Sequence, residues 1–173
     1  MDPKHLFMDK RLTGMCVHCG ARPNTRDHVP SKVLLDEPYP AELPVVEACE
    51  RCNNDFSLDE EYLSCFLECV ICGTVDSSEI RRQKVRRILN EDPKLKRRIE
   101  SSQRRDDAGN SVWLPEIDRV RKIVLKLARC HAAYELYPKL EDPVEVSFVP
   151  LPALSEQERM SFEHLRLWKL DFL

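Results

Sequence analysis

Four cysteines lie in two pairs whose spacing is that of a zinc site. Cys16 and Cys19 form one CxxC pair, and Cys49 and Cys52 form a second one after 29 intervening residues. Each tight turn presents two sulfurs, and two such turns supply the four thiolates of a tetrahedral zinc ion. Because this set is complete, we expect a structural Zn²⁺ that contributes folding free energy, with buried thiols that bind no metal as the alternative.

Further side chains that could do chemistry lie between the two cysteine pairs and directly after the second. Asp27-His28 stands in the interval, and Asn53 follows Cys52. The order CxxC, Asp-His, CxxC, Asn resembles that of the HNH, or ββα-metal, nucleases, and in particular a bacterial subgroup of that family with cysteine pairs. The resemblance covers residues 14–65, about a third of the chain. The middle asparagine of most members is missing here, since residues 43–46 read Leu-Pro-Val-Val.

The resemblance implies a role for three of these residues in phosphodiester hydrolysis. His28 would be the general base that takes a proton from water, which suits a side chain with an unperturbed pKa of about 6.5. Asp27 and Asn53 would supply oxygens to a catalytic divalent ion, Mg²⁺ or Mn²⁺. The alternatives are an Asp-His pair in a turn and an asparagine that only caps a helix, and Asn54 fits the role of Asn53 equally well.

Charge is distributed unevenly along a chain whose formal net charge is -3. Residues 33–68 hold ten acidic residues and one basic residue, whereas residues 81–105 hold eleven basic and three acidic ones. Such a basic segment either binds nucleic-acid phosphates or forms a solvated helix face. Beside a nuclease centre we expect the first, with these basic side chains on the nucleic acid: Arg26, Lys32, Arg81, Arg82 and Arg86.

The elements that must position these residues predict an α+β fold, a zinc-knuckled ββα-metal (HNH) centre with a largely helical C-terminal part. A short apolar stretch before Cys49 suits a strand, and helical spacing predicts a helix from Asn53 to Gly73. We expect the nuclease core with its zinc over residues 1–75 and a mainly helical extension over residues 76–173, packed on that core.

Capping signals predict the helices of the extension. Asp76 with Glu79 has the spacing of a capping box for a basic helix that ends near Leu89, and Asp92-Pro93 begins another helix. Residues 101–110 are predicted to be a flexible link. A long helix follows, and its apolar spacing predicts this core face: Ile117, Val120, Val124, Leu127, His131 and Tyr134. Alternation predicts a strand over residues 144–148, and Ser155 with Glu158 begins a short helix.

These features together predict a metal-dependent endonuclease that hydrolyses DNA. The alternatives are an RNA-directed nuclease with the same centre and a non-catalytic, zinc-scaffolded module that binds nucleic acid or protein. The first residues lack the pattern of a secretory signal, and no apolar stretch approaches the roughly 20 residues of a bilayer span, so we expect a cytoplasmic protein. His18 has no partner pattern, and the other cysteines are expected to be core thiols rather than ligands of a second metal: Cys65, Cys69, Cys72 and Cys130.

Overall fold

The fold begins with a two-stranded sheet that leads into a long helix. The computed structural model describes residues 14–136 and 154–164. Strand β1 (Thr25–His28) pairs with β2 (Val45–Ala48) in antiparallel register, and helix α1 (Glu50–Cys72) follows directly. A short 3-10 helix (Lys32–Leu34) lies in the loop between the strands. The predicted strand before Cys49 is confirmed.

Helix α1 has clear start and stop signals. The sulfur of Cys49 accepts a hydrogen bond from the N–H of Cys52 in the first turn. Gly73 ends the helix with a φ of 71°, a left-handed conformation that favours glycine. The predicted helix is confirmed and begins three residues earlier than expected, at Glu50.

Two short helices follow, α2 (Gln83–Glu91) and α3 (Pro93–Glu100). The prediction for α3 is confirmed, because the Asp92 carboxylate caps its first turn and Pro93 occupies the first position. The predicted start of α2 is wrong. Asp76 accepts hydrogen bonds from the N–H and hydroxyl of Ser78 and so stabilises a turn instead of a helix.

The predicted link over residues 101–110 is also wrong, because the chain forms a hairpin there. Strand β3 (Gln103–Arg105) pairs with β4 (Ser111–Trp113). The Asp106 carboxylate holds the turn by accepting from the N–H groups of Ala108 and Asn110. The strands are mostly exposed and polar, so they lack the alternation that marks a strand in a sequence.

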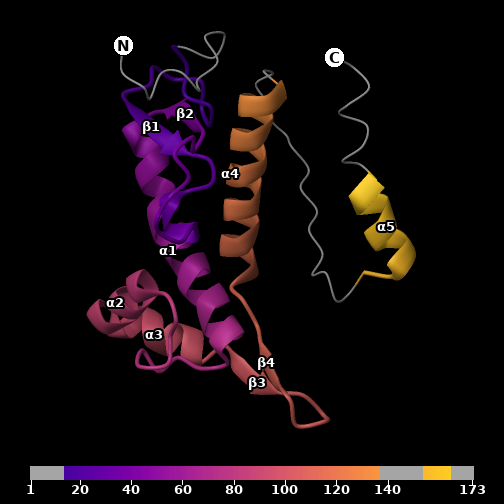
Figure 1. The fold of residues 1–173 in the computed structure, drawn as a ribbon. Coiled ribbons are helices and arrows are strands. Elements are labelled where there is room, and N and C mark those ends of the chain that lie inside the picture. Colours follow the sequence, from indigo (N-terminus) through magenta and orange to yellow (C-terminus); the bar gives the residue numbers. More distant parts are fainter. Residues whose placement is uncertain (1–13, 137–153, 165–173) are drawn as a thin grey trace.

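Helix α4 (Ile117–Leu136) lies alongside α1, while α2 and α3 pack at the far end of α1 from the β1–β2 hairpin (Figure 1). The predicted long helix is confirmed, but its predicted core face is only partly right, since Tyr134 packs against buried residues whereas Ile117 is 47% exposed. The buried face has helical spacing and includes a lysine: Ile123, Lys126, Cys130 and Ala133.

Buried side chains form two clusters in this mixed fold of helices and small antiparallel sheets. The larger one joins α1 to α2 and α3, and it includes Cys65 and Cys69 as core thiols. The smaller one joins the sheet to α4 through Val46 and Cys130. Helix α5 (Glu156–His164) begins with the predicted reciprocal bonds between Ser155 and Glu158, whereas the strand predicted over residues 144–148 lies outside the described residues. None of the described helices is long and apolar enough to cross a bilayer.

Candidate functional site

The structure brings the four predicted zinc ligands together. The Sγ atoms of Cys16, Cys19, Cys49 and Cys52 all lie within 4.8 Å of one another, and those of Cys19 and Cys49 are 3.7 Å apart. Tetrahedral zinc with Zn–S bonds of about 2.3 Å separates its sulfurs by about 3.8 Å. The four thiols therefore have the arrangement of a site that could hold a metal such as zinc.

Local backbone structure positions these cysteines. The N–H of Gly20 donates to the carbonyl of Cys16, closing the first turn, and the N–H of Val17 donates to Glu47 on β2. The second pair lies at the start of α1, where the N–H of Cys52 points at the Cys49 sulfur. This hydrogen bond is the main cause that lowers the pKa of Cys49 to about 7, so its thiolate forms readily.

Asp27 lies inside the protein and its carboxylate is fully engaged. Its side chain is 4% exposed. Oδ1 accepts a hydrogen bond from Nζ of Lys126 at 2.9 Å, and Oδ2 is 3.2 Å from Nε2 of His18. Burial alone would raise the pKa of Asp27, but the His18 hydrogen bond and the Lys126 charge outweigh it and lower the pKa. Cys130 on α4 completes the surroundings, with Sγ 4.0 Å from Oδ2.

Lys126 holds a second carboxylate beside the first. Its Nζ contacts Glu60 on α1 and lies 2.6 Å from the Ser31 hydroxyl, which itself donates to Glu60. The exposure of the Lys126 side chain is 0%. Sequence reasoning missed this group because its members lie on α1, α4 and the loop after β1. The one available signal was a lone lysine within the apolar stretch Ile123–Leu127.

His28 and Asn53 lie apart from this group. Successive strand residues point to opposite faces, so the side chain of His28 leaves β1 on the face opposite Asp27, and it is half-buried. Asn53 is half-buried in the first turn of α1, where its N–H donates to the Cys49 carbonyl. Among the described residues, the side-chain partners of Asp27 are Lys126, His18 and Cys130, and Asn53 is not one of them.

These positions do not suit a hydrated Mg²⁺ or Mn²⁺ ion at Asp27. Mg²⁺ keeps several of its waters and needs an open carboxylate oxygen. Both oxygens of Asp27 have protein partners inside the fold, so neither is open to an ion that keeps its waters. The ligand pair Asp27 and Asn53 therefore stays a prediction that this arrangement does not support.

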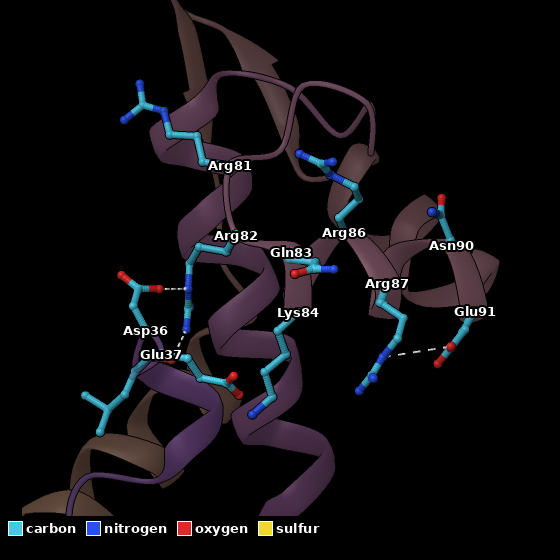
Figure 2. Close-up of a pocket in the computed structure, with 11 residues that line it drawn as sticks. Asp36, Glu37, Arg81, Arg82, Gln83, Lys84, Arg86, Arg87, Asn90 and Glu91 are labelled. Carbon is cyan, nitrogen blue, oxygen red and sulfur yellow. Dashed lines mark hydrogen bonds and ion pairs between the residues drawn. The ribbon is translucent and has the colours of Figure 1, made fainter. Parts of the chain in front are cut away.

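A cavity lined by basic side chains lies beside α2 (Figure 2). Arg81, Lys84, Arg86 and Arg87 line it together with Arg82 and three acidic residues, Asp36, Glu37 and Glu91. Arg81 and Arg86 extend away from Asp36, whereas Arg82 points toward it. Both Arg81 and Arg86 are exposed, as a phosphate-binding residue must be.

Arg82 has a structural role that does not fit the prediction of a nucleic-acid contact. Its guanidinium makes four hydrogen bonds, to the carbonyls of Val33 and Leu35, the hydroxyl of Ser64 and the carboxylate of Asp36. The side chain is 17% exposed. Arg82 therefore ties the loop after β1 to α1 and to the start of α2.

Tyr39 connects Lys32, four residues after His28, to the basic cavity. The ammonium groups of Lys32 and Lys84 lie 5.4 Å and 5.8 Å from the centre of its ring. Lys84 also lies 3.3 Å from the Tyr39 hydroxyl and contacts the Lys32 carbonyl. The predicted contact Lys32 thus adjoins α2, and sequence reasoning missed both Tyr39 and Lys84. The other predicted contact near His28, Arg26, is half-buried on β1.

Comparisons with protein-family models, with curated proteins and with solved structures find no match for this chain. Its function must therefore be inferred from the side chains of the site itself.

Proposed function

We propose that this protein is an HNH-type endonuclease that hydrolyses phosphodiester bonds of DNA, with His28 as the general base. One observation carries the proposal: Asp27-His28 lies on β1 of a hairpin whose second strand leads through a cysteine pair into α1. The four cysteines bring the turn before that hairpin close to the start of the helix. This order of strand, strand and helix, with the histidine on the first strand, is the one that the family resemblance predicts.

In this mechanism His28 accepts a proton from the attacking water. The water oxygen forms a bond to phosphorus, and the bond from phosphorus to the 3′ oxygen breaks, which leaves a 5′-phosphate and a 3′-hydroxyl. Lys32 and Lys84 hold the neighbouring phosphates together with the exposed arginines of the α2 cavity, Arg81, Arg86 and Arg87. The proposed reaction requires Mg²⁺ or Mn²⁺. The positions of Asp27 and Asn53 do not identify them as the ligands of that ion.

The buried state of Asp27 favours a second candidate. A carboxylate that is 4% exposed and paired with Lys126 fits a structural residue, which a nucleic-acid-binding module without catalysis would also contain. Such a module keeps the cysteine site and the basic cavity but has no use for His28.

Cleavage of plasmid DNA in Mg²⁺ or Mn²⁺ separates the two candidates. We expect the wild type to cut, and His28→Ala to lose cleavage while its zinc content, folding and DNA affinity stay near wild type. His131→Ala is the matched control, because His131 is an exposed histidine on α4. Cleavage by His28→Ala at the wild-type rate excludes His28 as the base. A wild type that binds but does not cut DNA or RNA favours the binding module.

A further inference from the structure

Three potential metal ligands from three separate segments converge at one point in the interior. His18 comes from the turn of the first cysteine pair, Asp27 from β1 and Cys130 from α4. One ligand atom of each lies within 4.8 Å of the other two. We propose that His18, Asp27 and Cys130 form a second site for a zinc-class transition metal, distinct from the four-cysteine site.

The distances among the three atoms are close to those of ligands around one ion. Nε2 of His18 is 3.2 Å from Oδ2 of Asp27, and Sγ of Cys130 is 3.9 Å and 4.0 Å from these two atoms. Around tetrahedral zinc, with bonds of about 2.0 Å to nitrogen and oxygen and 2.3 Å to sulfur, the corresponding separations are about 3.3 Å and 3.5 Å. A shift of a few tenths of an ångström in Cys130 would bring all three into bonding range.

The charges at this point also suit a cation. Asp27 and Glu60 are two buried carboxylates that both contact the ammonium of Lys126, so the three side chains sum to -1. A divalent ion that displaces the thiol proton of Cys130 adds a net +1 and balances the group.

The donor set decides the class of metal. Imidazole nitrogen and thiolate sulfur are ligands of zinc and neighbouring transition metals, whereas Mg²⁺ and Ca²⁺ take oxygen ligands. Among the described residues no fourth His, Cys, Asp or Glu joins the group, so a water molecule would complete the tetrahedron. Because all three ligands are buried, the ion would fasten α4 to β1 and to the first cysteine turn.

Metal counting on the purified full-length chain tests this proposal. The protein is reconstituted with excess Zn²⁺, freed of unbound metal and analysed by mass spectrometry. We expect two zinc ions per chain in the wild type and one in Cys130→Ser. Cys65→Ser is the matched control, since it removes a buried thiol of α1 that is far from this site in the sequence. This variant should keep two zinc ions. One zinc in the wild type, or equal counts in the wild type and Cys130→Ser, overturns the proposal.

A titration of the wild type with Co²⁺ gives a result even if Cys130→Ser fails to fold. Four thiolates give strong sulfur-to-cobalt charge transfer, and one thiolate gives weaker absorption. Two binding steps with unequal charge-transfer intensity support the second site, whereas saturation after one equivalent overturns it. Neither measurement depends on cleavage, so an inert protein with two metals would refute the nuclease and leave this site in place.

Discussion

The ammonium of Lys126 lies 2.9 Å from a carboxylate oxygen of Asp27, although the two residues are 99 positions apart in the chain. The same ammonium contacts Glu60, so one charge from α4 compensates two carboxylates, on β1 and α1. A buried charge whose partner is removed is strongly destabilising, because it can neither return to water nor find another counter-charge.

Replacing Lys126 with methionine should therefore destabilise the fold by about 3–5 kcal/mol. Urea unfolding of both proteins measures the difference. Lys122→Met is the matched control, because Lys122 lies on α4 like Lys126 and pairs with two carboxylates of α1, Asp55 and Asp59. Its side chain is 35% exposed, and surface pairs contribute at most about 1 kcal/mol. Equal effects of the two substitutions would contradict the structural role of Lys126.

Sequence patterns predicted those elements whose signals lie within a few residues. Gly73 ended α1, Asp92-Pro93 began α3, and Ser155 with Glu158 began α5, because caps and turn residues act locally. The four cysteines were predicted to meet because a metal explains their spacing.

What the sequence did not reveal depends on partners far along the chain. The buried face of α4 is defined by Lys126, which a hydrophobic pattern assigns to the surface until its two carboxylates are known. Arg82 looked like one more basic residue of a charged helix, whereas its partners lie 18 to 49 residues away. Long-range polar contacts of this kind leave no periodic signal.

Ionisation of the Tyr62 hydroxyl should lower the free energy of unfolding at alkaline pH. It accepts a hydrogen bond from the N–H of Glu116 at the start of α4, and burial raises the pKa of Tyr62 above its usual value of 10.0. The unfolded chain ionises first as the pH rises, so this residue's stabilisation is complete below about pH 10 and is lost above it.

Tyr62→Phe should consequently be less stable than the wild type by about 1 kcal/mol at pH 8, since the Glu116 N–H loses its acceptor. The difference should shrink as the pH rises from 10 toward 11, because only the wild type then loses the contribution of Tyr62. Unfolding free energies across this range provide the measurement. A difference that grows with pH would contradict the raised pKa.

The α2 cavity predicts which basic residues set the salt dependence of DNA binding. Arg81→Glu, Lys84→Glu and Arg87→Glu should each lower the slope of log affinity against log salt by about one. Arg121→Glu, on the exposed face of α4 outside the cavity, should leave the slope nearly unchanged. Unchanged slopes in all four variants would make the cavity a solvated surface.

Arg82→Glu should differ from Arg81→Glu in the stability of the fold. Four hydrogen bonds are lost at once, so the variant should unfold at a lower urea concentration than Arg81→Glu. A stable Arg82→Glu variant with only a reduced salt slope would make Arg82 a phosphate contact after all.

Removal of the four-cysteine metal should loosen the hairpin and the start of α1 together. Cys49→Ser should lose one zinc ion and unfold at a lower temperature, because structural zinc contributes folding free energy. Cys72→Ser, a half-buried thiol at the other end of α1, should keep its metal and lose little stability. A Cys49→Ser variant with full zinc content would exclude this thiol as a ligand.

The position of α4 determines where the chain could be divided. A fragment of residues 1–75 would contain β1, β2 and α1 with every cysteine of the four-thiol site, yet Asp27 and Glu60 would lose their ammonium. It would also expose the side of Val46 that packs on Cys130. The smallest autonomous folding unit is therefore expected to reach the end of α4 at Leu136, so the helical extension completes the N-terminal lobe instead of being an appendage to it.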